Sequence, residues 1–302
     1  MKHKVLISGG SGFMGKHISQ KLIENGDEVA WLVRSSSPGS TGIKSYLWDT
    51  SKHQIDPEAL RWATHVINLA GESIGETHWT KEGKTRILRS RIDSVNTLVS
   101  GMKNRTTPLQ GFVGVSGIGY YGPGTSPNSE TDAPGTGFPA EVAKAWEDAY
   151  SQITPQLSDK KSVIRLAVVL SVKSGALPKI LQPIRLGFGS VLGSGKQFFP
   201  WIHVEDAAEA FVQALEWDGT FNVAAAEELD NKQLTIQLAE VLHRPLLLPA
   251  VPAFALKLLL GDRASLVTEG NRASIHKLQD KGFSFAFPKF KNAVEDLISR
   301  SL

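Results

Sequence analysis

The sequence predicts a doubly wound α/β fold, in which helices cover both faces of a parallel β-sheet, followed by a smaller and mostly helical region. Three observations support this fold class. Strand-like and helix-like segments alternate through the first 170 or so residues, residues 162–171 (SVIRLAVVLS) have the apolar character of a buried parallel strand, and 302 residues suffice for one large domain and a smaller one.

The first unit is a strand, a helix and a second strand. Residues 3–8 (HKVLIS) form a short apolar strand, residues 13–26 carry apolar side chains at helical spacing and end at a glycine, and residues 27–34 (DEVAWLVR) form the next strand. The following elements, in chain order, are a strand at 44–48, a helix near 57–62 and a strand at 65–71.

The pattern continues with a long helix at about 80–102, a strand at 111–117 (GFVGVSG) and a helix at about 139–153. Between the last two lies a loop, 117–137, rich in Gly, Pro, Ser and Thr, whose length predicts that it covers a site. Beyond residue 172 the pattern loosens at 177–189 (LPKILQPIRLGFG), and we expect a hairpin at 190–199, a helix at 204–217 and further short helices.

We therefore divide the chain into a nucleotide-binding core at 1–172, to whose sheet later segments can return, and a substrate-side region at 173–302 that includes a small C-terminal domain at about 248–302.

The composition excludes several classes of function. The 33 basic and 30 acidic residues are interspersed, so the net charge of +3 forms no stripe for nucleic acid. The absence of cysteine excludes disulfides, thiol catalysis and Cys-ligated metal centres, and is compatible with a cytoplasmic location.

No export signal is visible, and the apolar stretch 251–261 falls short of the ~20 residues that span a bilayer. It predicts a buried or partner-facing helix, with a second copy of the chain as one candidate partner.

A glycine-rich turn follows the first strand. Gly9, Gly12 and Gly15 have the spacing G-x-x-G-x-x-G between a strand and a helix. The first glycine permits a tight turn, the second lets the backbone approach a pyrophosphate, and the third permits close packing of helix on strand. The start of the helix then offers free N–H groups to anionic oxygens. This arrangement predicts dinucleotide binding, and a flexible turn is the alternative.

The second strand ends in Val33 and Arg34, where an acidic residue would hydrogen-bond the ribose hydroxyls of NAD. No acidic residue is present there. Because a guanidinium can pair with a 2′-phosphate, the sequence favours NADP (NADPH) over NAD. A solvated surface arginine is the alternative.

In these residues the chain resembles the extended short-chain dehydrogenase/reductase superfamily, also known as the NAD-dependent epimerase/dehydratase superfamily. More closely, it is similar to the atypical subgroup of epimerase family proteins that end in a domain of unknown function. The motifs that carry the resemblance run nearly end to end and are GGSGFMG (9–15), INLAGE (67–72), SRI (90–92), GYYG (119–122), LGSGKQFFPWIHVED (192–206) and LPAVPAFALKLLLGD (248–262).

The resemblance implies a Rossmann domain that carries NADP(H), with the substrate between it and the C-terminal region. It also implies the cofactor contacts, which are Gly9, Gly12, Phe13, Met14 and Gly15 at the pyrophosphate, Val33 and Arg34 at the adenosine phosphate, Leu69, Ala70 and Gly71 along the ribose, and Arg91 as a further contact.

Working members of this superfamily pair a tyrosine with a lysine four residues later, which lowers the pKa of the phenol. The position four residues after each of the four tyrosines holds Thr50, Gly124, Thr125 or Thr154. In the helix where the pair belongs, the matching positions are Pro139 and Ala143, with Lys144 one place away. The Tyr-x-x-x-Lys pair is missing, which weakens the transfer of standard chemistry.

The remaining candidates for catalysis are Ser116 at a strand end, Tyr120 and Tyr121 just after it, and the carboxylates Glu72 and Glu141. Each has a structural alternative: a strand-end hydroxyl, core packing of the aromatic rings, or a solvated or capping carboxylate. A tyrosine with an ordinary pKa near ~10 is a poor base at neutral pH.

Trp201 and His203 are candidates for lining the substrate pocket, since the matching segment packs there in extended relatives. No cluster of His, Asp and Glu has the spacing of a metal site, so no metal is expected. Two functions follow as hypotheses. The first is an NADP(H)-dependent oxidoreductase or epimerase acting on an unidentified small molecule. The second is a cofactor-binding sensor without turnover.

Overall fold

The computed structural model describes residues 2–35 and 42–300. In these residues the main sheet has eight strands, in the order β11-β8-β6-β5-β1-β2-β3-β4. Their bounds are β1 (Lys4–Ser8), β2 (Glu28–Val33), β3 (Lys44–Asp49), β4 (Gln54–Ile55), β5 (His65–Asn68), β6 (Leu109–Gly117), β8 (Ser158–Leu166) and β11 (Gly219–Val223). All neighbouring strands are parallel except the short edge strand β4, which is antiparallel to β3.

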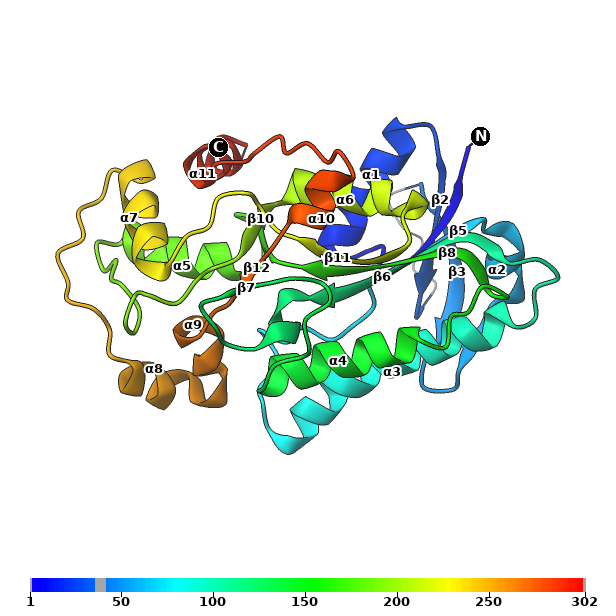
Figure 1. Ribbon diagram of the computed structural model, residues 1–302, viewed down its shortest axis with the longest axis horizontal. Helices are drawn as coiled ribbons and strands as arrows, with labels where there is room; N and C mark the ends of the chain where they lie inside the picture. Colours follow the sequence, from blue (N-terminus) through cyan, green and yellow to red (C-terminus); the bar gives the residue numbers. More distant parts are fainter. Residues whose placement is uncertain (1, 36–41, 301–302) are drawn as a thin grey trace.

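Helices cover both faces of this sheet (Figure 1). The helices are α1 (Phe13–Glu24), α2 (Pro57–Trp62), α3 (Lys81–Met102), α4 (Phe138–Tyr150), α5 (Ala176–Arg185), α6 (Val204–Gln213), α7 (Asn231–Val241), α8 (Ala253–Leu260), α9 (Ser265–Thr268), α10 (His276–Asp280) and α11 (Phe290–Ser299). Short 3₁₀ turns are η1 (Ile118–Tyr121), η2 (Ala214–Glu216) and η3 (Gly261–Ala264). Helices α3 and α4 pack together on one face, and α1 packs against α6 on the other.

Several helices begin where the sequence supplies a cap. The side chain of Asp56 accepts a hydrogen bond from the backbone of Glu58 at the start of α2, and Thr80 does the same for Gly83 in α3. At the start of α7, Asp230 and Gln233 form a reciprocal capping box. These side chains satisfy backbone N–H groups that have no partner inside the helix, which fixes where each helix begins.

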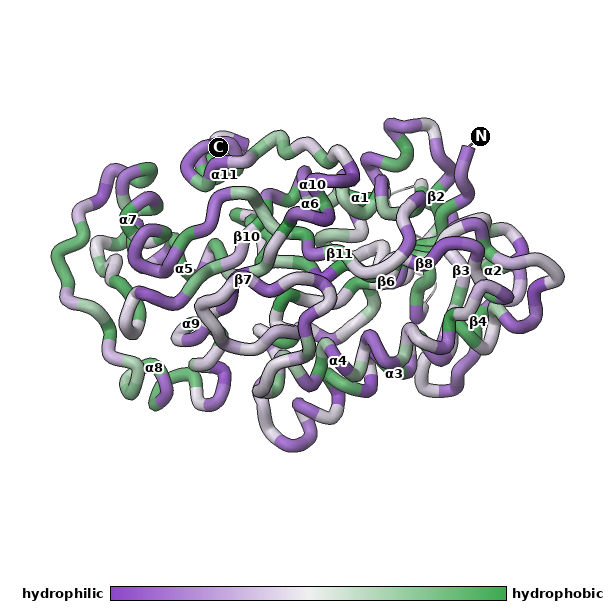
Figure 2. Tube along the Cα trace, viewed as in Figure 1, coloured by the Kyte–Doolittle hydropathy of each residue, from purple (hydrophilic) through white to green (hydrophobic). Residues whose placement is uncertain are grey.

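The central strands β1 and β5 are buried on both faces, as parallel strands covered by two helical layers must be. Hydrophobic residues are frequent along the sheet (Figure 2). One core lies between the sheet and α1 and α6, with Ile7, Ile18 and Phe211 fully buried. A second lies between the other face and α2, α3 and α4, where Leu98 and Tyr150 are fully buried. The predicted fold class is therefore confirmed.

A third core joins α5, α7 and α11 beside the main sheet. Near it, β9 (Val168–Leu170) leaves the line of β8 and pairs in parallel with β10 (Trp201–His203). A second small sheet pairs β7 (Pro127–Asn128) with β12 (Arg272–Ala273), which ties the long loop after β6 to the C-terminal region. In the described residues, no helix is long and apolar enough to cross a membrane.

The structure differs from the sequence-based expectation at the predicted hairpin. Residues 190–199 form no hairpin and make only single bridges, from Leu192 to Val251 and from Phe198 to Asp230. Their partners are distant in sequence, so the local turn pattern could not reveal them. Further along, α6 and β11 return to the main sheet, where β11 pairs with β8.

Candidate functional site

The glycine turn between β1 and α1 is tightly folded. Gly9 has a φ of +71°, which L side chains rarely adopt, and the backbone N–H of Gly12 donates to the Gly9 carbonyl at 3.0 Å. A Cβ on Gly15 would lie 2.4 Å from the Gly9 oxygen. Gly12 caps α1 without a side chain, and Phe13 and Met14 open the helix. The first N–H groups of α1 are thus exposed to an incoming anion.

Gly10 also shapes this turn, although its spacing in the sequence did not single it out. A Cβ on Gly10 would lie 2.1 Å from the Trp31 ring, whose indole N–H donates to Ser19 Oγ at 2.8 Å. Because Gly10 has no side chain, Trp31 of β2 can pack directly against the turn. In the sequence, only the GG dipeptide at 9–10 indicated this close contact.

The ends of β2 and β5 flank the turn. Ser8 of β1 is in register with Leu32 of β2 and with Asn68 of β5. Val33, half-buried, and Arg34, exposed, follow Leu32 at that end of the sheet. This register brings Arg34 to the same edge as the glycine turn, where the sequence predicts the adenosine phosphate.

On the other side, the segment Leu69, Ala70 and Gly71 follows β5. The backbone N–H of Leu69 donates to the Ser8 carbonyl at 3.1 Å, and a Cβ on Gly9 would meet the Leu69 backbone at 3.2 Å. The side chain of Asn68 is buried and bonds Ser8, Ser94 and Tyr150. Asn68 therefore holds the turn and this segment together, a role that the sequence analysis did not assign.

Arg91 of α3 is buried beside this segment, with 8% of its surface exposed. One terminal nitrogen donates to the carbonyls of Glu72 and Ile87, both at 2.9 Å, and the guanidinium lies 4.7 Å from the centre of the Trp146 ring. Its Nε is buried and has no hydrogen-bond partner, and no carboxylate among the described residues forms an ion pair with it. Burial lowers the pKa of Arg91 to about 10, although the nearby Glu72 carboxylate partly offsets this effect, so Arg91 remains a cation at neutral pH.

A cavity of about 510 Å³ opens next to Arg91, at the carboxyl ends of β6 and β8. Ser116 and Gly117 of β6 and Leu166 of β8 form one wall. The remaining lining is largely apolar and includes Phe138, Val142 and Trp146 of α4, and Phe199, Leu266 and Asn271 of the C-terminal half. In parallel α/β sheets, ligands bind at this end of the strands.

The two positions that the sequence matches to the Tyr-x-x-x-Lys pair of the superfamily face this cavity. Pro139 and Ala143 both line it. The missing pair therefore leaves an apolar surface at the place where the proton donor would stand.

Ser116 is the one sequence-predicted catalytic candidate that lines the cavity. It is buried, and its hydroxyl donates to Glu147 Oε1 at 2.7 Å. Glu147 in turn forms a two-pronged ion pair with Arg165, at 2.9 Å from Nε and 2.8 Å from a terminal nitrogen. The sequence analysis missed this pair, although a single arginine inside the apolar strand SVIRLAVVLS was a signal for a buried ionic partner.

The two tyrosines pack against the same arginine. Tyr121 is buried, accepts a hydrogen bond from Arg165 at 2.8 Å and donates one to Asn222 at 2.7 Å. The ring of Tyr120 lies under the guanidinium at 3.5 Å. Ser116, Arg165 and Asn222 are in register across β6, β8 and β11, which explains why the polar groups meet.

Burial raises the pKa of Tyr121, and neither tyrosine lines the cavity. This geometry favours structural roles for both.

The other predicted candidates also lie outside the cavity lining. Glu72 accepts hydrogen bonds from Thr77 and Arg86, and Glu141 is exposed in the first turn of α4. Trp201 is buried in the third core, where its indole donates to the carbonyl of Glu227. For these residues the contacts favour structural roles over contact with a substrate.

His203 is fully buried at the start of α6. Its Nδ1 accepts a hydrogen bond from the backbone of Glu205 at 3.2 Å, and its Nε2 lies 3.2 Å from Asp296 Oδ2. Burial lowers the pKa of His203 to about 4. The folded protein therefore excludes a proton that the unfolded chain, with a histidine pKa near ~6.5, takes up as the pH falls.

This predicts a specific loss of stability in acid. The contribution of neutral His203 is complete above about pH 6.5 and declines as the pH falls toward about 4, by roughly 1–2 kcal/mol between pH 7 and pH 5. His203→Asn retains a capping acceptor but has no group to titrate, so its unfolding free energy should fall less over this range. Urea denaturation at both pH values measures the difference, and equal slopes for the two proteins would contradict the assignment.

The fold and the site together define a Rossmann-type nucleotide-binding fold with a ligand cavity at the carboxyl edge of its sheet. Residues 5–224 match the NAD dependent epimerase/dehydratase family, and residues 251–297 match a domain of unknown function, DUF1731. The chain belongs to the NAD dependent epimerase/dehydratase family, which confirms the resemblance seen in the sequence.

Individual relatives match over nearly the whole chain. The epimerase family protein SDR39U1 of Mus musculus is 32% identical over 304 residues, which are 98% of this chain and 100% of that one. The epimerase family protein YfhF of Bacillus subtilis (strain 168) is 31% identical over 98% of both chains.

Solved structures give the same picture. The crystal structure of human epimerase family protein SDR39U1 (isoform2) with NADPH superposes with a TM-score of 0.87 at 28% identity, over 98% of this chain and 99% of that one. A UDP-glucose 4-epimerase of Thermus thermophilus in complex with NAD has a TM-score of 0.76 at 19% identity, over 99% of this chain and 100% of that one. At that identity the likeness shows the fold alone.

Proposed function

We propose that the protein binds NADP(H) and acts as an oxidoreductase or epimerase on a small molecule held in the cavity beside Ser116. The observation that carries this proposal is the cavity itself, which is joined to the glycine turn by residues 69–71 and Arg91. The human relative solved with NADPH supports the choice of cofactor.

The residues present suit such a cofactor. The glycine turn leaves space in front of the α1 N-terminus, where backbone N–H groups suit a pyrophosphate. Arg91 has a buried Nε without a hydrogen-bond partner, and a ligand in the cavity would supply an acceptor for it. Arg34, at the end of β2, suits a 2′-phosphate.

The cofactor, when bound, supplies or accepts the hydride. The chain itself contributes Ser116, whose proton is directed to Glu147, so its oxygen lone pairs are available to accept a hydrogen bond from a substrate hydroxyl. As the carbon that bears this hydroxyl gives up a hydride and becomes a carbonyl carbon, the hydroxyl proton can pass to Ser116 while the Ser116 proton passes to Glu147. In the reverse direction the same path returns the proton. Arg165 holds Glu147 in position for this exchange.

The cavity also favours a class of substrate. Its walls are mostly apolar, with Phe138, Trp146 and Phe199 among them. Such a surface suits a hydrophobic or aromatic body with one hydroxyl or carbonyl group better than a sugar, whose hydroxyls would lose water without gaining partners.

Turnover tests the role of Ser116. Cofactor absorbance would be followed against a panel of apolar aldehydes, ketones and alcohols and of nucleotide sugars. Ser116→Ala should lower kcat/KM by about a hundredfold or more without changing NADPH affinity, whereas Ser73→Ala in the loop after β5 should change neither. Full turnover in both Ser116→Ala and Tyr121→Phe would remove this segment from the mechanism. Saturable NADPH binding with no turnover on any substrate would favour the sensor function instead.

Cofactor choice gives a second test. Arg34→Glu places a negative charge where the 2′-phosphate is proposed, so NADPH affinity should fall by about tenfold or more while NADH affinity changes little. Arg185→Glu, an exposed change of the same charge in α5, is the matched control. Fluorescence titration measures both affinities. Tighter binding of NADH by the unaltered protein, or unchanged NADPH affinity in Arg34→Glu, would overturn the assignment.

Partners and location remain predictions. Helix α8 exposes Phe254, Leu258 and Leu259 to solvent, which suits the partner-facing helix predicted at 251–261. A second copy of the chain as its partner, a cytoplasmic location, and the absence of nucleic-acid and membrane partners rest on the sequence arguments alone.

A further inference from the structure

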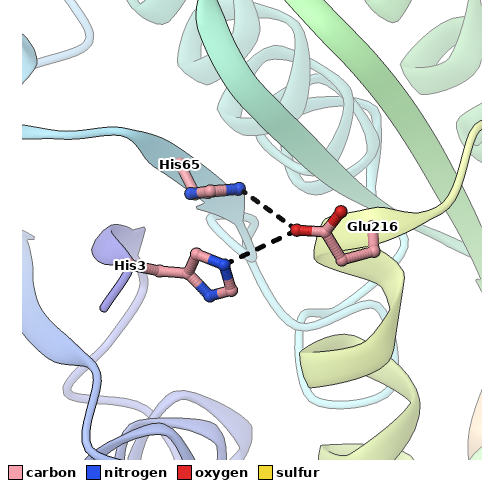
Figure 3. A group of neighbouring side chains, drawn as sticks. All are labelled: His3, His65 and Glu216. Carbon is pink, nitrogen blue, oxygen red and sulfur yellow. Dashed lines mark ion pairs between the residues drawn. The ribbon is translucent and has the colours of Figure 1, made fainter. Parts of the chain in front are cut away.

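Three side chains far apart in the sequence converge at the amino-terminal edge of the main sheet (Figure 3). His3 precedes β1, His65 opens β5, and Glu216 ends η2. Glu216 Oε1 lies 3.5 Å from His3 Nε2 and 3.9 Å from His65 Nε2, and the three ligand atoms are all within 4.8 Å of one another. This edge is opposite the end of the strands that carries the glycine turn and the cavity.

The far nitrogen of each imidazole ring lies near another side chain, which makes a hydrogen bond with His65 and only a longer ion-pair contact with His3. Thr64 Oγ1 lies 2.9 Å from His65 Nδ1, and Asp27 Oδ1 lies 3.4 Å from His3 Nδ1. In proteins, a hydroxyl or carboxylate at one ring nitrogen fixes the ring so that the other nitrogen can bind a metal. Here the second nitrogen of each ring, Nε2, is the one directed at Glu216 (Figure 3).

The fold makes room for this arrangement. His65 is in register with Gly111 of β6, and a Cβ on Gly111 would lie 2.7 Å from His65 Cδ2. The rings of His3 and His65 are 4.5 Å apart between centres. Lys160 bonds Glu216 Oε2, so the carboxylate is held with Oε1 toward the two rings.

We propose that His3, His65 and Glu216 bind one divalent transition-metal ion of the Zn²⁺ type. Two imidazole nitrogens and one carboxylate oxygen suit Zn²⁺, Co²⁺, Ni²⁺ or Cu²⁺, whereas Mg²⁺ and Ca²⁺ require a shell of oxygens. Bonds of ~2.0–2.1 Å to a tetrahedral ion place the ligand atoms roughly 3.4 Å apart. The 3.5 Å spacing from His3 to Glu216 already satisfies this, whereas the 3.9 Å spacing from His65 to Glu216 and the spacing between the two imidazoles, which is within 4.8 Å, must shorten as the side chains close on the ion.

The sequence analysis expected no metal because these residues are separated by long stretches of chain, and only the parallel sheet brings them together. At this edge the ion would take no part in the reaction. It would join the N-terminal segment, β5 and η2, and so add stability to the folded sheet by binding it in preference to the unfolded chain.

Calorimetric titration of the untagged, chelator-treated full chain with Zn²⁺ tests the proposal. We expect one Zn²⁺ per chain, no competition from excess Mg²⁺, and a higher Tm with Zn²⁺ present. His3→Gln, His65→Gln and Glu216→Gln should each weaken Zn²⁺ binding by about tenfold or more, and His276→Ala, which removes a histidine of α10, should leave it unchanged.

The variants at His3 and Glu216 distinguish a loss of Zn²⁺ ligands from a loss of folding. His65 is buried and its substitution can disturb the sheet, whereas His3 and Glu216 are partly exposed, with 28% and 55% of their side chains accessible. NADPH affinity and circular dichroism of His3→Gln and Glu216→Gln should match the unaltered protein. An absence of saturable Zn²⁺ binding, or binding of equal strength in these two variants, would overturn the site.

Discussion

Arg165→Met should lower the free energy of unfolding by about 3–5 kcal/mol, the cost of leaving one partner of a buried ion pair without the other. Arg165 is 4% exposed, and the side chain of Glu147 is 14% exposed. The substitution also removes the hydrogen bond to Tyr121 and the cation above Tyr120. The hydrogen bonds and ring contacts that Glu147, Tyr120 and Tyr121 make at the ends of β6 and β8 therefore depend on the Arg165 guanidinium.

Urea denaturation measures this loss. Arg185→Met, the same change at an exposed position of α5, should cost less than about 1 kcal/mol. The double variant Arg165→Met, Glu147→Leu should recover a large part of the stability, because it removes the unpaired charge as well. A loss below about 1 kcal/mol in Arg165→Met, or a double variant no more stable than the single one, would show that the pair is not a buried unit.

Gly12→Val should abolish most of the NADPH affinity, by roughly a hundredfold, at a smaller cost in stability than Gly15→Ala. The backbone of Gly12 is extended, with a φ of −73°, so a side chain is permitted there. A Cβ would meet only the Gly9 carbonyl oxygen, at 3.1 Å, and the rest of the side chain would fill the space in front of α1. That space is where we propose the pyrophosphate.

Gly75→Val is the matched control, since nothing lies within 4 Å of a Cβ at that position in the loop after β5. It should retain full NADPH affinity in a fluorescence titration. Gly15→Ala should lose both affinity and stability, because its Cβ would be 2.4 Å from the Gly9 oxygen and the turn itself must shift. Normal NADPH binding by Gly12→Val would exclude the glycine turn as the pyrophosphate site.

The features that sequence alone predicts are the local ones. The β1–α1–β2 unit and its glycine turn depend on residues close together in the chain, and the periodicity of the helices marks α1, α2 and α3 nearly to their ends. The hairpin predicted at 190–199 was wrong because residues distant in sequence, near 230 and 251, replace the local pairing.

The candidate site shows the same division. Ser116 lines the cavity as expected of a strand end, but its partner Glu147 is 31 residues away and the arginine that fixes Glu147 lies on another strand. Tyr120 and Tyr121 were catalytic candidates in the sequence because their two hydroxyls follow Ser116 closely. In the structure both rings pack against Arg165 and neither lines the cavity. Residue spacing could not predict this contact, because it depends on the register between β6 and β8.

A crystal structure of the protein grown with NADPH tests the proposed site most directly. We expect the pyrophosphate at the backbone N–H groups of the turn formed by residues 9–15, the 2′-phosphate at Arg34, and the nicotinamide in the cavity beside Ser116 with Arg91 facing the bound cofactor. A cofactor whose phosphates avoid the glycine turn, or whose nicotinamide lies outside the cavity, would contradict the proposed function.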